Sequence, residues 1–292
     1  MQKIKFESDI EWLAYRKQHI GASDAPIIMG ASKWKLDDGR IKTPHVLWQE
    51  KLGLLDTTIN NAAVQYGRNM EGAAREVYQT MVGDLFEATV VINKKYPHLM
   101  ASLDGLNITG DRAVEIKQAN AEDHALAKQG IIPDKYYPQV MQQYLVSEVD
   151  YIDYFSFHKG EGVRVPVKKD EKYLKLLEKN LNSFWDCVVN LKEPELTEND
   201  FIERTGEWIS IAESLYKVQQ EKKALEVEEK KLKEQLKNCS KGQNSRAGGF
   251  RYTLSTITGR VDYKSIPELL NVDLEQYRGK PTESWRLKKE KE

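Results

Sequence analysis

SLDGLNITGDRAVEIKQ, residues 102–118, holds two short apolar runs separated by a connection rich in Gly and Asp. The second run alternates, so Glu115 and Lys117 share one face of a strand while the apolar residues between them point to the other. If a turn over residues 105–110 closes a hairpin, Asp104 lies beside both of them. The stretch therefore predicts a hairpin from which two carboxylates and one ammonium group project together.

This set of side chains indicates chemistry on phosphate esters. Two carboxylates that lie close together repel each other unless a cation sits between them, and oxygen ligands of this kind suit Mg²⁺ or Mn²⁺. A lysine beside that cation can orient a water for attack on phosphorus. The alternative interpretation of so short a motif is a surface hairpin with an ordinary Glu–Lys pair.

The composition narrows the class of protein. The chain of 292 residues has 44 Lys and Arg against 45 Asp and Glu, so any contact with DNA must come from a local cleft and not from a uniformly basic surface. Its two cysteines, Cys187 and Cys239, lie far apart and are expected to be reduced thiols of a cytosolic protein. No apolar run approaches about 20 residues, so we expect no membrane span.

Helical and strand-like patterns flank the central hairpin on both sides. Before it, they predict helices over residues 8–20, from Ser23 or Asp24 onward, 43–53 and 60–81, and then strands over 85–93, 98–106 and 112–118. After it, they predict helices over 121–128 and 134–149, a hairpin of strands 151–158 and 162–169, and a helix over 170–191. The order of helices, antiparallel meander and further mixed elements indicates an α/β domain.

Arg16 and Ser23 are candidates for binding an anion. The short helix that starts at Ser23 or Asp24 follows small residues, and free backbone N–H groups at such a start favour phosphate. Arg16, seven residues upstream of Ser23, could add a charged fork for phosphate oxygens. The alternative is a capping serine and a solvated arginine.

Polar residues on two longer helices are further candidates. Glu71 could join a metal site or hold a metal-bound water, whereas a helical Glu more often pairs with a nearby Arg, here Arg68 or Arg75. Gln139 and Gln143 are one turn apart and share a face, which suits contact with a nucleic-acid backbone or with the lysine. A half-buried helix with Gln at its edge is the alternative.

The composition changes after the charged stretch LKEPELTEND, residues 191–200, which favours a domain boundary there. The predicted domains are residues 1–195 and 196–292. Eight residues beyond the boundary follow the four-three spacing of a coiled-coil seam: Ile211, Leu215, Val218, Lys222, Leu225, Glu229, Leu232 and Leu236. Such a helix is stable only against a partner helix or subunit. Residues 240–249 are expected to form a flexible link, followed by one or two short strands and a helix capped near Ser265.

Six motifs occur in an order that we identify as that of a known family: WLAYRKQHIGASDAP, TPHVLWQEKLG, GRNMEGAAREVY, ASLDGL, VEIKQ and YYPQVMQQYL. In these the chain resembles phage recombination exonucleases of the YqaJ and lambda exonuclease type, members of the PD-(D/E)xK nuclease superfamily. The resemblance covers Trp12 to about Lys169 and implies a restriction-endonuclease-like core, a mixed sheet flanked by helices. The usual Pro of the superfamily motif is absent before Asp104.

The resemblance implies roles for the residues of the central hairpin. Asp104 and Glu115 would hold the divalent metal, with the backbone carbonyl of Ile116 as a further ligand. Mg²⁺ is the expected metal, and Mn²⁺ is expected to substitute for it. Lys117 would orient the attacking water, and Glu71 would lie near the metal-bound water.

Residues outside the hairpin also match the family. Arg16 and Ser23 match its 5'-phosphate anchor, and Gln143 matches its Gln on the helix after the motif strand. Gln139 is the competing register for that last match.

The function that the resemblance implies is metal-dependent 5'-to-3' exonuclease action on linear double-stranded DNA, leaving a 3' single strand for a phage annealing protein. A homo-oligomer that closes into a ring around DNA, in the cytoplasm of a bacterial host, is the expected setting. Two alternatives stay open. One is a structure- or sequence-specific endonuclease of the same fold, and the other is a DNA-binding scaffold with a vestigial site.

Overall fold

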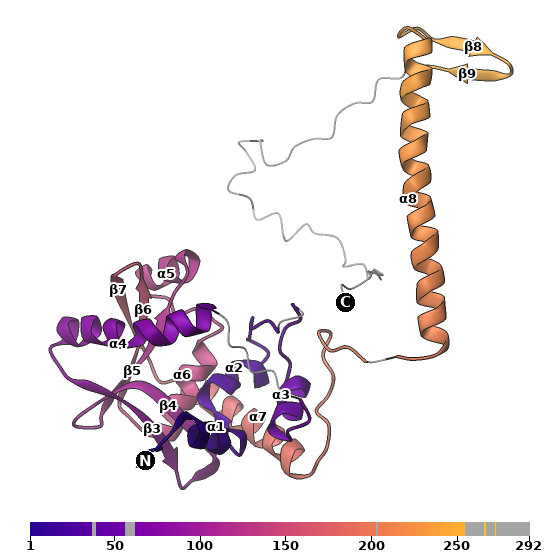
Figure 1. The fold of residues 1–292 in the computed structure, drawn as a ribbon. Helices are drawn as coiled ribbons and strands as arrows, with labels where there is room; N and C mark the ends of the chain where they lie inside the picture. The colour runs from indigo at the N-terminus through magenta and orange to yellow at the C-terminus, as the bar shows by residue number, and fades with distance from the viewer. Residues whose placement is uncertain (37–38, 56–61, 203, 255–265, 267–271, 273–292) are drawn as a thin grey trace. The chain divides into compact units, whose positions relative to one another are not determined.

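The computed structural model describes residues 1–36, 39–55, 62–202, 204–254, 266 and 272, with only the backbone described for 62–69. The chain divides into two compact units, Met1–Phe201 and Ile202–Glu292 (Figure 1). The predicted hairpin and its candidate residues belong to the first unit.

A seven-stranded mixed sheet forms the centre of the first unit. Its strands are β1 (Gln2–Ile4), β2 (Ile20–Gly21), β3 (Phe86–Asn93), β4 (Tyr96–Asn107), β5 (Arg112–Gln118), β6 (Tyr151–His158) and β7 (Glu161–Val167). They lie in the order β1-β3-β4-β5-β6-β7, with β2 beside β4. The pairs β5–β6 and β2–β4 are parallel and the others antiparallel. The predicted α/β class and the antiparallel meander of β3, β4 and β5 are confirmed.

The helices of this unit are α1 (Asp9–Lys17), the 3₁₀ helix η1 (Ala22–Asp24), α2 (Ala25–Ile28), α3 (Pro44–Lys51), α4 (Ala62–Val82), α5 (Ala121–Lys128), α6 (Tyr137–Ser147) and α7 (Glu171–Val189). Ser8, Thr43 and Asp170 each accept a hydrogen bond from the backbone N–H three residues ahead, which fixes where α1, α3 and α7 begin. Of the helices described here, none is long and apolar enough to cross a bilayer.

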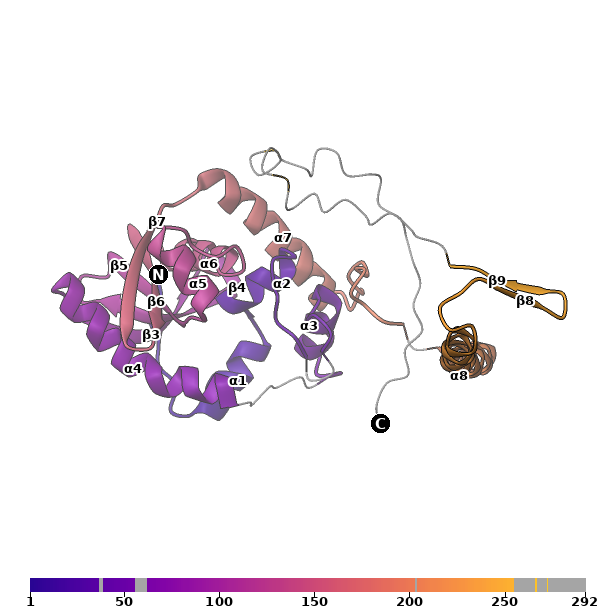
Figure 2. The same ribbon diagram turned by 90° about the horizontal axis from the view of Figure 1, so that it is seen from above.

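The helices cover both faces of the sheet. α4 packs on one face through Ala74 and Tyr78, against Val114 and Ile116 of β5. α5 and α6 lie on the other face (Figure 2). Because side chains alternate along a strand, the polar residues of β5 are turned toward α6.

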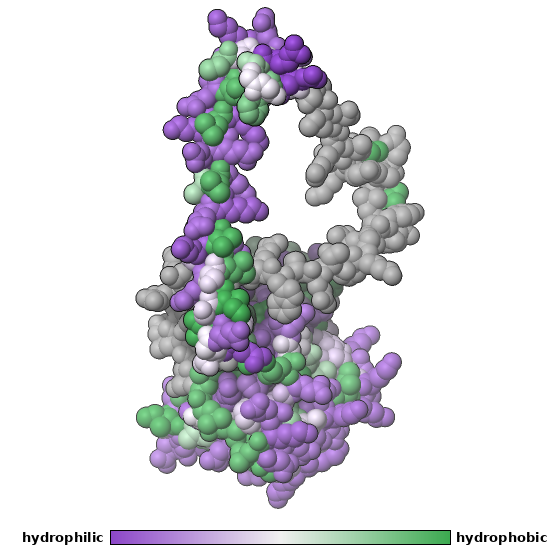
Figure 3. Space-filling model, turned by 90° about the vertical axis from the view of Figure 1, so that its right-hand side faces the viewer, coloured by the Kyte–Doolittle hydropathy of each residue, from purple (hydrophilic) through white to green (hydrophobic). Residues whose placement is uncertain are grey.

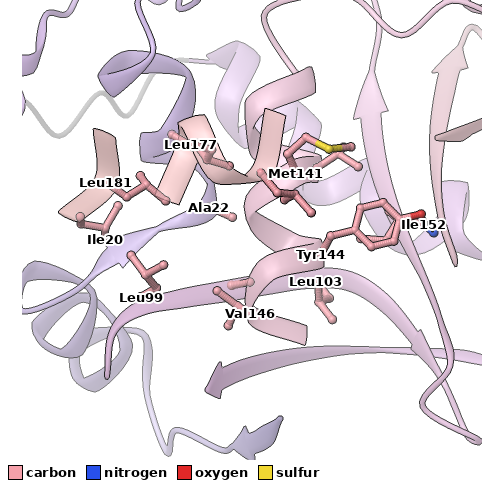
Figure 4. Close-up of a cluster of buried hydrophobic side chains, with 14 of the residues drawn as sticks. Ile20, Ala22, Leu99, Leu103, Met141, Tyr144, Val146, Ile152, Leu177 and Leu181 are labelled. Carbon is pink, nitrogen blue, oxygen red and sulfur yellow. Dashed lines mark hydrogen bonds between the residues drawn. The ribbon is translucent and has the colours of Figure 1, made fainter. Parts of the chain in front are cut away.

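α6 is held between α7 and the sheet. Figure 4 shows Leu177 and Leu181 of α7 gathered with Met141 of α6 and with Leu99 and Leu103 of β4, and none of the five is more than 2% exposed. Close packing of this kind fixes side-chain positions on the sheet-facing side of α6. The helix therefore presents its glutamines to β5 from a rigid support.

α6 is shorter than the helix predicted over 134–149. Pro138 occupies its first turn, and residues 134–137 form a hydrogen-bonded turn ahead of it. Glu148 ends the helix in the left-handed region, with φ of 55°. The predicted helix is thus correct in its centre and too long at both ends.

The second unit contains α8 (Glu207–Cys239) and a hairpin of β8 (Ser245–Ala247) with β9 (Phe250–Tyr252). Gly248 and Gly249 connect the two strands with φ of 54° and 82°, the left-handed conformation that a tight two-residue hairpin turn requires. The prediction of a flexible link over 240–249 is therefore wrong for its last five residues. The helix predicted near Ser265 lies outside the described residues.

Candidate active site

Asp104 and Glu115 lie opposite each other where β4 and β5 begin to separate. Antiparallel pairing of residues 105–106 with 113–114 sets the register, and Asp104 and Glu115 are the next pair along. Here the Asp104 side chain takes the place of a backbone acceptor, since its Oδ2 accepts a hydrogen bond from the Ile116 N–H at 2.7 Å. Both carboxylates therefore project from the α6 face at one point of the sheet.

Gly105 allows the strands to approach each other this closely. A Cβ at this position would lie 2.8 Å from Val114 Cγ1 and 2.9 Å from Phe86 Cβ, distances that real Cβ atoms do not tolerate. Any other residue after Asp104 would push β4 away from its neighbours. The Asp-Gly sequence is thus needed both for its carboxylate and for its lack of a side chain.

Three donors surround the Glu115 carboxylate, which is only 1% exposed. Gln139 Nε2 donates to Oε1 at 2.6 Å, and Gln143 Nε2 donates to Oε2. Lys117 Nζ forms an ion pair with Oε1. Because Gln139 and Gln143 are one helical turn apart, both registers considered for the matching glutamine reach the same carboxylate.

The charges in this cluster affect one another. Burial raises the pKa of Asp104 well above its ordinary value, and the Glu115 carboxylate raises it further. Burial would lower the pKa of Lys117, but Glu115 and Asp104 outweigh that effect and hold this pKa above its ordinary value. One ammonium group therefore faces two carboxylates, of which Glu115 is buried and Asp104 partly buried, an arrangement that favours a further cation.

Arg75 joins Glu71 of α4 to this cluster. Its Nη2 donates to Glu71 Oε1 at 2.7 Å, and its Nε donates to the backbone carbonyl of Asp104 at 2.5 Å. The Glu71 carboxylate is one of the charges that raise the pKa of Asp104, after burial and Glu115. Glu71 therefore lies at the edge of the carboxylate pair, in an ion pair with one of the two arginines considered.

The oxygen atoms of this cluster suit a hard divalent cation that retains some of its coordinated water molecules. The described residues contain no group of three or more His, Cys, Asp or Glu side chains that could enclose a metal ion. Mg²⁺, however, is usually bound by one or two carboxylates and retains several waters, which Asp104 and Glu115 can satisfy. Within the described part of the chain, Gln143 Oε1 is buried without a hydrogen-bond partner and adds an unused oxygen beside the pair.

Arg16 and Ser23 form a second cluster. Arg16 Nη2 donates to Ser23 Oγ and to Asp24 Oδ1, both at 2.8 Å. The guanidinium group packs on Gly21, where a Cβ would lie 3.0 Å from Nη1. The expected contact of Arg16 with Ser23 is present, but the anion at the centre of this cluster is the protein's own Asp24.

Lys51 of α3 completes the second cluster. Its Nζ donates to Asp24 Oδ2 at 2.8 Å and to the backbone carbonyls of Arg16 and His19 at 3.1 and 2.6 Å. Sequence reasoning missed this residue because it lies 27 positions from Asp24 and no local pattern joins them. The short helix α2 has only four residues, so the cluster depends on these side chains and not on a helix start.

The two clusters are joined through α6. Between the two glutamines that reach Glu115 lies Gln142, whose Nε2 donates to the carbonyls of Ile20 and Met100 at 2.9 and 3.2 Å. Ile20 directly precedes Gly21 in β2, under the Arg16 guanidinium group. One face of α6 therefore contacts both candidate sites.

Tyr136 is a further neighbour of the carboxylate cluster. Lys117 Nζ lies 5.4 Å from the centre of its ring, and the ring stacks on Tyr154 with centroids 5.7 Å apart. A cation above an aromatic face is attracted to it, so the tyrosine helps to place the lysine. In the sequence, the only indication of this contact is that Tyr136 directly precedes the helix that carries the glutamines.

Comparison with known proteins finds a match to the family that the motifs resemble. Residues 11–150 match the YqaJ-like viral recombinase domain. The chain is 25% identical, over an alignment of 291 residues, to the Uncharacterized protein YqaJ of Bacillus subtilis (strain 168), covering 88% of this chain and 87% of that protein.

Two solved structures share the fold. An alkaline exonuclease, LHK-Exo from Laribacter hongkongensis, superposes with a TM-score of 0.53 at 21% identity, covering 63% of this chain and 94% of that one. The complex of LHK-Exo with dAMP gives a TM-score of 0.54 with the same identity and coverage. The restriction-endonuclease-like core expected from the sequence is therefore confirmed.

Proposed function

We propose, from the premise that residues 11–150 form a YqaJ-like viral recombinase domain, that this protein is a metal-dependent exonuclease acting on linear double-stranded DNA in the 5'-to-3' direction. The observation that carries the proposal is the buried cluster in which Lys117 contacts Glu115 opposite Asp104. Two carboxylates and a lysine at one point of a sheet suit hydrolysis of a phosphodiester bond.

Each residue of the cluster has a defined task in this proposal. Asp104 and Glu115, with the Ile116 carbonyl, would hold Mg²⁺, or Mn²⁺ in its place. The bound ion would stabilise charge on the attacking and leaving oxygens of the phosphate. Lys117 donates to the attacking water and orients it toward phosphorus. Glu71, held by Arg75, accepts a hydrogen bond from water at the opposite edge.

The glutamines of α6 act through Glu115. Gln139 and Gln143 each donate to one oxygen of its carboxylate, so they fix its rotation. Oε1 also pairs with Lys117, which leaves the second lone pair of Oε2 for the metal position. The two glutamines are positioning residues in this proposal.

Arg16 and Ser23 would bind the 5'-phosphate of the DNA end. The guanidinium fork is already oriented by Ser23 and Asp24, and a terminal phosphate would be a stronger acceptor for its remaining N–H groups than water. A phosphate pocket apart from the carboxylate cluster makes hydrolysis depend on an end. This separation supports exonuclease action over internal cutting.

The wider setting is part of the same proposal. The enzyme would leave a 3' single strand for a single-strand annealing protein during phage-type recombination in the bacterial cytoplasm. It would act as a homo-oligomer that closes into a ring around the DNA.

The proposal is tested with three forms of one duplex, which are linear with a 5'-phosphate, linear with a 5'-hydroxyl, and closed circular, all in Mg²⁺. We expect the wild type to degrade the phosphorylated linear form fastest and to spare the circle. Lys117→Ala should be inactive on every form, and Arg16→Ala should lose the preference for phosphate. Cutting of the circle by the wild type would instead establish an endonuclease, and no cutting would favour a DNA-binding scaffold.

Metal binding is tested apart from activity. Titration of Mn²⁺ in a calorimeter should give a binding heat for the wild type that is lost in Asp104→Asn. The unfolding midpoint in urea, measured on both proteins, checks that the variant is folded. Equal Mn²⁺ binding by the two proteins would remove Asp104 from the metal site.

A further inference from the structure

The α8 seam, the eight residues Ile211 to Leu236 spaced as given above, is uncovered along its length. Among the 33 residues of α8 none is buried. The six apolar members of the seam are each between 47% and 65% exposed: Ile211, Leu215, Val218, Leu225, Leu232 and Leu236. Figure 3 shows hydrophobic residues recurring along α8 between hydrophilic ones.

A helix with this surface is not stable as an isolated element. At about 1.5 Å per residue it is about 50 Å long, and most helical stability in proteins comes from packing of an apolar face. Repetition of that face every 3.5 residues is the pattern that pairs two helices in a coiled coil. A shallow groove lined between Lys222 and Leu236 runs along the same face. The missing element is therefore another long helix.

The two charged members of the seam identify which helix fits. Lys222 and Glu229 have opposite charges and stand seven residues apart at equivalent positions of the repeat. In a parallel pair of identical helices, Lys222 would face Lys222 and Glu229 would face Glu229, and like charges in a seam are destabilising. In an antiparallel pair each lysine can lie beside the glutamate of the other helix.

We propose that α8 pairs with α8 of a second copy of this chain in an antiparallel coiled coil centred near residue 227. In this register Lys222 packs opposite the partner's Leu232, and Leu225 opposite the partner's Glu229. The partner's Glu229 is then offset from Lys222 by three residues, or about 4.5 Å along the axis. Each charged side chain stays within reach of its opposite, and the groove between Lys222 and Leu236 is filled.

The helix also holds these charges in place before pairing. Within one helix, Lys222 forms an ion pair with Glu226, and Glu229 with Lys233, both one turn ahead. The pairing does not depend on the proposed nuclease activity, since none of these residues belongs to the first unit.

Cysteine cross-linking tests the orientation on the full chain. In a Cys187→Ser background the remaining thiol is Cys239, at the end of α8 and exposed. In the antiparallel register Cys239 packs opposite the partner's Leu215, whereas in a parallel pair it would meet its own copy. With copper phenanthroline as oxidant, Leu215→Cys should give a covalent dimer. Lys217→Cys, which is off the seam, and the background protein should not.

A second experiment tests the seam itself by sedimentation of the full chain over a range of concentrations. Leu225→Asp should weaken self-association by more than about tenfold, because it places an unpaired charge in the seam. Val227→Asp is the matched control, since Val227 is 67% exposed and Leu225 is 65% exposed but Val227 points away from the seam. Lys222→Glu should weaken association, and adding Glu229→Lys should restore it.

Several outcomes would overturn the proposal. Cross-linking of Cys239 to itself in the background protein would establish a parallel pair. Failure of Leu215→Cys to cross-link, or equal effects of the Leu225 and Val227 substitutions, would show that the seam faces something other than α8. Nuclease activity is measured on the Leu225→Asp and Val227→Asp proteins alongside their self-association, so a loss of pairing and a loss of nuclease activity are read separately.

Discussion

At the residue scale, Glu115 shows how the fold fixes a charged group inside the protein. It is almost fully buried, and all of its described donors, Gln139, Gln143 and Lys117, come from α6 or from its own strand. Hydrogen bonds to an ionised group are stronger than those between neutral groups, and a buried charge without them is costly. Gln139 and Gln143 of α6 both donate to Glu115, whereas Gln142 between them donates to backbone carbonyls.

Substitution of Gln143 by Leu is predicted to lower activity and metal affinity about 10–100-fold, because Glu115 loses a donor that fixes its orientation. The measurement is the Mg²⁺ concentration that gives half of the maximal nuclease rate. Gln142→Leu is the control from the same helix. It should cost about 1–3 kcal/mol of stability by removing buried hydrogen bonds to two backbone carbonyls, with no change in the Mg²⁺ requirement. The same shift in both variants would contradict the assigned roles.

Asp24 is predicted to make stability depend on pH. Burial would raise the pKa of Asp24, but Lys51 and Arg16 outweigh that effect and hold it well below the ordinary value of 3.8. A carboxyl group whose pKa is lower in the folded state stabilises the protein above its unfolded pKa, and this stabilisation is lost as the pH falls from there toward the folded pKa. Urea midpoints measured between about pH 6 and pH 2 should therefore fall more steeply for the wild type than for Asp24→Asn. Parallel curves would show that Asp24 does not provide this linkage.

At the element scale, the position of α6 depends on α7. Leu174, Leu177, Leu181 and Phe184 recur at helical spacing and are all buried against α6 and the sheet. This regular pattern made α7 predictable from the sequence, with its cap at Asp170. Because α7 packs against α6, the positions of the α6 glutamines depend on the packing of α7.

Leu177→Ala is predicted to destabilise the protein by about 2–5 kcal/mol, since Leu177 is fully buried and its loss leaves a cavity. Leu176→Ala is a matched control, because this neighbour in the same helix is 50% exposed, and we expect a change below about 0.5 kcal/mol. The free energy of unfolding is obtained from urea titration of both variants. Similar losses in the two would mean that α7 does not pack as described.

The elements that sequence reasoning placed well are those with a strong repeat or a cap. The hairpin of β4 and β5 was predictable because alternation and a Gly-rich turn agree, and it brought Asp104, Glu115 and Lys117 together. β9 lies where one or two short strands were expected after residue 249, but its partner β8 was missed because it has only three residues, too few for an alternating pattern to stand out. Lys51 was missed for another reason, since its contacts with Asp24 arise only from tertiary packing.

At the scale of the whole molecule, the apolar core belongs to one of the two units. Every buried apolar residue among those described lies in Met1–Phe201, and the described part of the second unit contributes none. The first unit also closes on itself at its end, where Thr43 Oγ1 donates to Asp200 Oδ1 at 2.5 Å. Each unit is therefore expected to gain its stability separately.

A chain that ends at Phe201 is predicted to keep the unfolding midpoint of the full protein, because the removed part contributes no described buried residue. Circular dichroism with urea titration measures both the midpoint and the loss of signal from α8. Aggregation or a midpoint lowered by more than the experimental error would show that the first unit needs the second.

The bond from the Ile116 N–H to the Asp104 carboxylate has a consequence for spectroscopy. Most amide protons in a sheet report on backbone pairing, whereas this one senses a side-chain charge in its place. Protonation or ion binding at Asp104 withdraws electron density from its oxygens, so the nitrogen and proton chemical shifts of Ile116 must change with it. In an NMR titration of protein labelled with ¹⁵N at isoleucine, the Ile116 signal would thus supply an internal probe of the carboxylate, readable without any DNA.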